Sequence, residues 1–110
     1  MNPKFVLVSR PERPLVGTFV YGMVGQHEEL VERCRQTLGY VKVHGGGWYE
    51  KDDVHRTMTL YGRSYDYGDP DLSFLNCIPA ELRDYKFFFI PGWDTRIPGN
   101  ELDLTGVEWL

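Results

Sequence analysis

The chain has 110 residues, enough for one domain with a buried core, and 42% of them are hydrophobic. Its formal net charge of −4 argues against a nucleic-acid groove or an anionic membrane surface as the main partner, although local basic residues can still bind one phosphate. No segment approaches the roughly 20 apolar residues that span a bilayer, and the N-terminus lacks the apolar run of a signal peptide. We therefore expect a cytoplasmic protein that binds neither nucleic acid nor a membrane.

The first half of the chain predicts two strands followed by a helix. The segments from Lys4 to Ser9 and from Val16 to Met23 are rich in β-branched and aromatic residues, and two prolines separate them. His27 then opens the predicted helix, with carboxylates in its first turn, where the helix dipole favours negative charge. Its apolar positions recur at helical spacing, at Leu30, Val31, Cys34 and Leu38, before a glycine stop at Gly39.

The second half predicts three more strands and a second helix. A strand from Tyr40 to His44 precedes the glycines, and a hairpin follows, with arms from Trp48 to Lys51 and from Thr57 to Tyr61. The second helix is predicted to start at Asp69–Pro70, with Leu72, Phe74, Leu75 and Ile78 on its apolar face. The apolar run from Tyr85 to Ile90 predicts a central strand, and residues 91–110 form a tail punctuated by glycine and proline.

This order of elements predicts one α/β domain, a mixed sheet flanked by two helices. Cys34 and Cys77 both fall in apolar patterns that we interpret as helical, so we expect buried thiols rather than a disulfide or a nucleophile. Reduced cysteines are typical of a cytoplasmic protein.

The most informative stretch runs from His44 to Gly68, HGGGWYEKDDVHRTMTLYGRSYDYG. It holds three consecutive glycines and a Tyr-Gly-x-Ser-x-x-Tyr-Gly segment that starts at Tyr61. Together with the N-terminal PKFVLVSR and the helix-opening His27, this pattern resembles the Janus/Ocnus family of small phosphohistidine phosphatases. The resemblance implies a similar fold and metal-independent hydrolysis of a phosphorus–nitrogen bond without a cofactor. It leaves residues 91–110 unmatched, as a C-terminal extension.

His27 is the candidate catalytic residue. A neutral imidazole is the usual general base near pH 7, and the alternative from the sequence alone is a solvated histidine in the first turn of a helix. The resemblance implies that His27 is the essential active-site residue of the family, because it follows the second strand and opens the first helix. Whether it acts as a base or as a transient nucleophile stays open.

The remaining candidates would bind the phosphate. Lys4 supplies a compact ammonium charge, and the resemblance places it at the family's phosphate-binding lysine. In the family motif, the serine at Ser64 and nearby main-chain amides hold phosphate oxygens, and Gly46 belongs to the matching glycine run. Alternatively, Ser64 is a turn-forming residue with a capping bond, and the glycines bend the chain beside the site. Gly62 and Arg63 complete the predicted phosphate loop.

Three positions depart from the family pattern, and one of them is Gln26, which stands where an aromatic residue commonly precedes the histidine. Known members carry an arginine directly after the glycines and another eight places before the histidine, and these positions are Trp48 and Phe19 here. Arg63 and Arg56 are the nearest replacements. The expected partner is a phosphorylated protein or a small phosphoramidate, and the alternative is a non-catalytic module that binds phosphate or protein. The histidines and cysteines lack the spacing of metal ligands, so no metal site is predicted.

Overall fold

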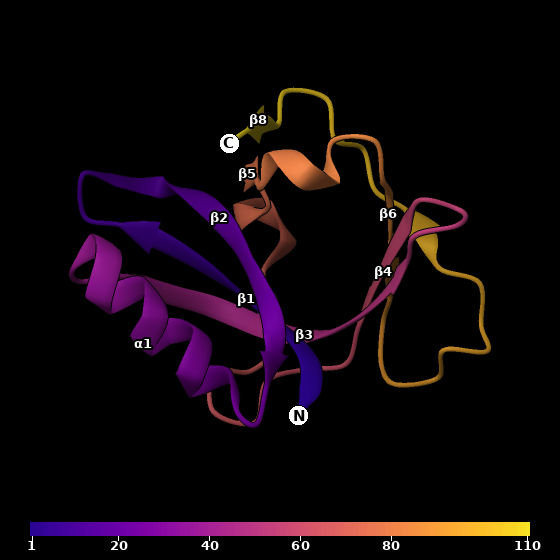
Figure 1. Ribbon diagram of the computed structural model, residues 1–110, viewed down its shortest axis with the longest axis horizontal. Helices are drawn as coiled ribbons and strands as arrows, with labels where there is room; N and C mark the ends of the chain where they lie inside the picture. Colours follow the sequence, from indigo (N-terminus) through magenta and orange to yellow (C-terminus); the bar gives the residue numbers. More distant parts are fainter.

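An eight-stranded mixed sheet and one helix make up most of the computed structural model, which describes residues 1–110. The strands lie in the order β7-β6-β4-β3-β1-β2-β5-β8, and the sheet curls strongly (Figure 1). The elements are β1 (Asn2–Arg10), β2 (Arg13–Val24), α1 (His27–Leu38), β3 (Lys42–Asp52), β4 (Thr57–Tyr61), β5 (Cys77–Ile78), β6 (Lys86–Ile90), β7 (Asn100–Glu101) and β8 (Glu108–Trp109). The prediction of one domain with a mixed sheet is therefore confirmed.

Three long antiparallel strands form the centre of the sheet. β1 pairs with β2 on one side and with β3 on the other, and β4 continues the sheet antiparallel to β3. β6 is parallel to β4, and β5 is parallel to β2. Because β4 and β6 are parallel neighbours, the loops that follow them begin at the same end of the two strands.

Alternation along β1 divides the core into two parts. Phe5 and Leu7 point into the larger cluster, and Val6 and Val8 into the smaller one beneath α1. The helix covers β1 and β2 on this smaller side, whereas two short 3₁₀ turns and the C-terminal tail fill the other side (Figure 1). Lys4 precedes Val6 by two residues, so its side chain lies on the helix side of the sheet.

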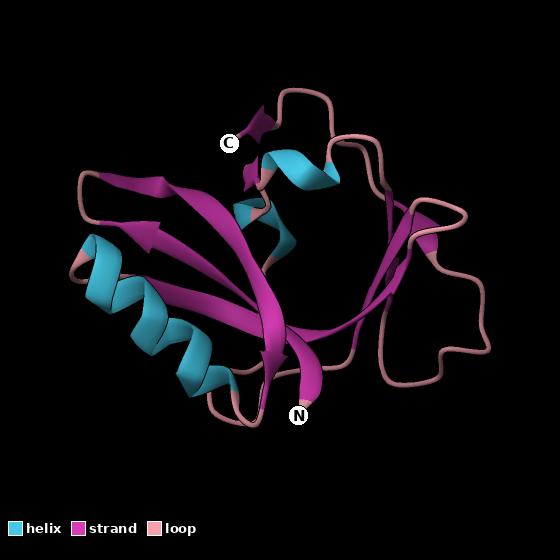
Figure 2. Cartoon of the chain, in the orientation of Figure 1, coloured by secondary structure: helices cyan, strands magenta, loops and turns pink.

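The predicted second helix is wrong. Residues 69–78 instead form a 3₁₀ turn at Leu72–Phe74 and the short strand β5, and Figure 2 shows α1 as the one long helix. The Asp71 carboxylate accepts bonds from the Ser73 backbone N–H and hydroxyl, which closes a tight turn. Pro79 disfavours a helical conformation for the residue before it, Ile78. Cys77 is consequently in a strand, although both cysteines are free and buried.

One further expectation, that of two separate segments around the glycines, needs correction. The strand predicted from Tyr40 to His44 and the first hairpin arm are one continuous strand, β3, which runs through the glycines with a register shift opposite β1. The tail is not an appendage to the sheet. It supplies β7 at one edge and β8 at the other, and it packs Leu102, Leu104, Val107 and Trp109 against the larger core cluster.

No helix is long and apolar enough to cross a membrane.

Candidate functional site

His27 lies at the start of α1, directly beneath the glycines of β3. The residue is only 4% exposed, yet it forms part of the lining of two cavities beside the central strands β1 and β3. Its Nε2 is 2.8 Å from the carbonyl oxygen of Gly47. Since a carbonyl only accepts, Nε2 must carry the hydrogen and donate it.

This bond leaves the second ring nitrogen of His27 free. In the neutral ring, a hydrogen on Nε2 makes Nδ1 an acceptor with an available lone pair. Nδ1 has no hydrogen-bond partner in the protein. Every fully buried side-chain nitrogen or oxygen in the structure does have a partner, so Nδ1 is not fully buried. Nδ1 is therefore open to the cavity, where it can accept a proton or attack an electrophile.

The surroundings of His27 keep its ring neutral. Burial lowers the pKa of His27 below the usual 6.5, and the nearby Lys4 ammonium lowers it further. The bond to Gly47 and the charge of Asp66 oppose this shift without reversing it. The neutral, basic form of the imidazole is consequently the main one at pH 7.

The ammonium group of Lys4 is held at the rim of the same site. Its Nζ donates to the carbonyl of Gly25, 2.8 Å away in the turn that precedes α1, and lies 5.1 Å from the ring centre of Trp48. Lys4 and Trp48 are directly paired across β1 and β3, which places both side chains on the helix side of the sheet. An ammonium has three N–H donors, so two remain for a ligand.

The three glycines of β3 make room for the site and for the core. A Cβ on Gly46 would lie 2.4 Å from the Phe5 carbonyl oxygen and 3.1 Å from the ring of His27, and one on Gly47 would reach the ring of Phe5. Gly45 has φ +88, and a Cβ there would lie 1.9 Å from the Asp69 carbonyl oxygen. Close approach thus explains the glycine triplet.

Ser64 lies behind the cavity rather than on its surface. The residue is fully buried, and its hydroxyl accepts a hydrogen bond from the Tyr67 backbone N–H at 3.1 Å. Its own N–H points toward the carbonyls of Gly46 and Gly68. In this structure Ser64 holds the loop of residues 62–68 against β3.

The same loop carries two backbone N–H groups without a hydrogen-bond partner, in residues that line the site. Tyr65 and Asp66 line the second cavity, of about 300 Å³, together with Lys4, Gln26 and His27. The backbone N–H groups of Tyr65 and Asp66 make no hydrogen bond within the protein. A hydrogen bond between the Tyr67 phenol and the Glu28 carboxylate joins the loop to the first turn of α1.

The first cavity, of about 330 Å³, combines cationic and aromatic groups. It is lined by Lys4, His27, Trp48, Arg63, Tyr65 and Trp93. The structure thus brings the predicted residues Lys4, His27 and Arg63 together, with Gly46 against the histidine ring and Gly62 behind Trp93. The guanidinium of Arg63 has only one long contact with a carboxylate, 3.9 Å to Asp69, so it can turn to an anion. Arg56 instead lies over the ring of Tyr85, at the β3–β4 turn.

The structure shows where Phe19 and Trp93 lie relative to the site. Phe19 is fully buried in the larger core cluster, on the side of the sheet away from His27, so its side chain does not face the site. Trp93, in the segment after β6, was expected only as part of an aromatic protein-binding surface with Trp48 and Trp109, and not as a lining residue of this cavity. Tyr61 and Ile90 end two parallel strands in register, so the loops that follow them are neighbours, and this pairing is visible only in the folded structure.

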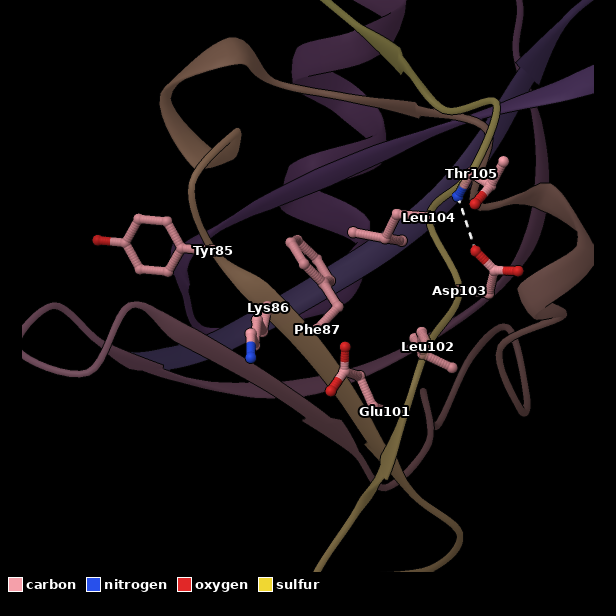
Figure 3. A pocket seen from close by; sticks show the side chains of 8 residues that line it. All are labelled: Tyr85, Lys86, Phe87, Glu101, Leu102, Asp103, Leu104 and Thr105. Atoms are coloured by element: carbon pink, nitrogen blue, oxygen red, sulfur yellow. Dashed lines mark hydrogen bonds between the residues drawn. The ribbon is translucent and has the colours of Figure 1, made fainter.

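The largest cavity lies elsewhere. It measures about 610 Å³ and is a groove between β6 and the tail, shown in Figure 3. Its lining is formed by Tyr85, Lys86, Phe87, Glu101, Leu102, Asp103, Leu104 and Thr105. It contains no histidine, and Asp103 is already bonded to the Thr105 N–H at 2.9 Å. We therefore place the functional site at His27.

No group of three His, Cys, Asp or Glu side chains lies close enough together to hold a metal ion. The chemistry available at His27 is that of a fixed neutral imidazole beside an ammonium, a guanidinium and free amides. Such a set suits a small anion with an electrophilic centre, of which a phosphoryl group is the commonest.

Comparison with known protein families assigns the chain to one of them. The model of the Janus/Ocnus family matches residues 5–86, which include His27, the glycines and the loop of residues 62–68. No curated protein matches the chain. The match stops before Trp93 and the rest of the tail. Since it spans well over half of the 110 residues, the chain belongs to the Janus/Ocnus family.

Proposed function

We propose that the protein hydrolyses phosphohistidine, with His27 as the catalytic residue. One observation carries the proposal: the buried neutral imidazole donates through Nε2 to Gly47 and presents a free Nδ1 next to the Lys4 ammonium. The membership of the Janus/Ocnus family supports it.

In the proposed reaction, Nδ1 of His27 accepts a proton from a water molecule while the water oxygen attacks phosphorus. The phosphorus–nitrogen bond breaks, and the imidazole of the substrate leaves with the bonding electron pair and takes up a proton from solvent. Phosphoryl transfer has a loose transition state, so positioning and charge stabilisation contribute most of the rate acceleration. Lys4 and the free N–H groups of Tyr65 and Asp66 would hold the non-bridging oxygens.

A second candidate function is binding of a phosphorylated group without turnover. The observation that favours it is the Asp66 carboxylate, which lines the cavity with Lys4 and offsets part of its positive charge. The guanidinium directly after the family's glycines is also replaced by the indole of Trp48. Both changes reduce the positive charge that the site offers to the phosphoryl group during its transfer.

Release of inorganic phosphate from phosphohistidine tests the proposal. Wild type should release phosphate, and His27→Ala should be slower by about 10²–10⁴-fold, the usual contribution of a positioned acid or base. His55→Ala is the matched control, since His55 is an exposed histidine in the β3–β4 turn, and its rate should equal that of wild type. Binding of a phosphohistidine peptide without release would favour the second candidate.

A further inference from the structure

Two tryptophans from distant parts of the chain meet at the catalytic cavity. Trp48 belongs to β3, and Trp93 follows β6, outside the residues that the family model matches. Their rings contact edge to face, with centres 6.0 Å apart and planes at 73°. Trp93 makes a similar contact with Tyr61, at 6.2 Å. The rings of Trp48 and Trp93, called here the Trp48–Trp93 wall, line the cavity together with Lys4 and His27.

The position of Trp93 is built into the backbone. The Gly62 N–H donates to the Gly92 carbonyl at 2.7 Å, which joins the phosphate loop to the segment that carries the tryptophan. A Cβ on Gly62 would lie 2.5 Å from the indole ring of Trp93, so only glycine lets the ring lie flat against this turn. Gly62 also has φ +69, a conformation that glycine adopts without strain.

Despite these contacts, Trp93 remains 54% exposed. An indole held in place while half of its surface meets solvent is a typical anchor for a flat apolar group. The cavity beside it, of about 330 Å³, has room for a phosphoryl group and one ring. Lys4 and Arg63 line the same cavity as the two tryptophans. Because both are cationic, the cavity favours binding of a ring that carries an anionic group.

We propose that the Trp48–Trp93 wall is a subsite for a flat ring bonded directly to the phosphoryl group. The substrate class is then phosphoryl groups on aromatic rings, such as the imidazole of phosphohistidine, in preference to phosphoryl groups on ammonia or on an aliphatic amine. This inference rests on the proposed function only in placing the phosphoryl group beside Lys4 and His27. The tail beyond the family match thus determines selectivity for the leaving group.

Binding of non-hydrolysable phosphonates tests the subsite independently of catalysis. Phenylphosphonate, cyclohexylphosphonate and methylphosphonate have the same anionic head but differ in the size and flatness of the attached group. By calorimetry, phenylphosphonate should bind about tenfold more tightly than methylphosphonate, which corresponds to about 1.4 kcal/mol, with the cyclohexyl compound between them. Trp93→Leu should reduce this ratio to within about twofold, and Lys4→Ala should weaken all three by a similar factor.

Tyr40→Leu is the matched control, because Tyr40 is an exposed aromatic residue beyond the C-terminal end of α1, and it should leave the ratio unchanged. Equal affinities for the three phosphonates in wild type would overturn the subsite, as would an unchanged ratio in folded Trp93→Leu. If ring preference is present but phosphohistidine is not hydrolysed, the subsite stands and the proposed catalysis fails. If hydrolysis occurs without ring preference, the subsite is disproved and the proposed catalysis stands.

Discussion

A single hydrogen bond determines the chemistry of His27. By donating from Nε2 to the Gly47 carbonyl, the ring is fixed in one tautomer and one orientation, with Nδ1 toward the cavity. Glycine at position 46 leaves room for the imidazole that makes this bond. A Cβ there would lie 3.1 Å from the ring of His27 and 2.4 Å from the Phe5 carbonyl oxygen. His27, the proposed catalytic residue, and the glycines are therefore one structural unit.

Replacing Gly46 with alanine should disturb this unit. The added methyl group would lie 2.4 Å from the Phe5 carbonyl oxygen, where backbone on both strands must move. We expect a loss of about 1–3 kcal/mol in the free energy of unfolding, as for an overpacked core, and reduced turnover. Denaturant titration measures the loss. Gly22→Ala is the control, because a Cβ there makes only ordinary contacts, and equal losses in both variants would contradict the explanation.

Among the elements, the loop of residues 62–68 depends on its ties to β3 and α1. The Tyr67 phenol donates to Glu28 in the first turn of the helix, and burial together with this bond raises the pKa of Tyr67 to about 12. Ser64 makes the bonds to β3. The loop therefore holds its free amides in place only while both ties are intact.

Tyr67→Phe should loosen the loop without unfolding the protein. Loss of the phenol bond should cost about 1 kcal/mol, and amide hydrogen exchange should become faster in residues 62–68. Tyr65→Phe is the control within the same loop, since the Tyr65 side chain is 98% exposed and has no hydrogen bond. Exchange rates that rise equally in both variants, or in neither, would show that the tie to Glu28 does not order the loop.

The attachment of β3 to the 3₁₀ turn gives the fold a pH dependence. His44 stacks on Phe74 with ring centres 3.5 Å apart, and its Nε2 lies 2.7 Å from the Ser9 hydroxyl. Burial, followed by the charge of Lys42, lowers the pKa of His44 below 6.5. The unfolded chain therefore takes up the proton first, and the free energy of unfolding should fall as the pH drops below about 6.5 until it passes the folded-state pKa.

Thermal unfolding between pH 7.5 and 5 measures this effect. His44→Gln keeps an acceptor for the Ser9 hydroxyl but cannot be protonated, so its midpoint should depend less on pH than that of wild type. A pH dependence as steep in the variant as in wild type would assign the effect to other groups.

Elements with a strong period or composition were predictable, and those fixed by tertiary contacts were not. β1, β2, α1, β4 and β6 match their predictions because alternating or helical apolar patterns specify them. The segment of residues 69–78 has apolar residues at helical spacing, but Asp71 and Pro79 favour turns, so a 3₁₀ turn and a strand form instead. The convergence of His27 and Lys4 at one cavity was predicted from family motifs, whereas Trp93 reaches that cavity through the parallel pairing of β4 with β6.

At the scale of the whole molecule, the tail runs from one edge of the curled sheet to the other. It adds a strand to each edge and supplies four apolar side chains to the larger core cluster, and it also carries Trp93 to the cavity. Fold stability and site composition thus both depend on residues beyond the family match, which ends at residue 86.

Deletion of residues 91–110 should therefore abolish cooperative unfolding. Full burial of one large apolar side chain contributes about 1.5–3 kcal/mol, and the four tail side chains are partly buried, so their combined loss is a large part of the roughly 5–15 kcal/mol that stabilises a typical domain. Near-ultraviolet circular dichroism and thermal melting measure the outcome. A truncated chain that melts at the same temperature as the full chain would show that the tail is dispensable for the fold.

The pH dependence of kcat/KM for phosphohistidine tests the central claim most directly, that neutral His27 is the catalytic base. After subtraction of spontaneous hydrolysis, kcat/KM should be constant near pH 7. It should fall as the pH drops through the lowered pKa of His27, below 6.5, because the protonated ring cannot accept a proton. His27→Ala should lack this acidic limb and be about 10²–10⁴-fold slower at pH 7. An acidic limb that persists unchanged in His27→Ala, or wild-type activity retained by this variant, would contradict the account.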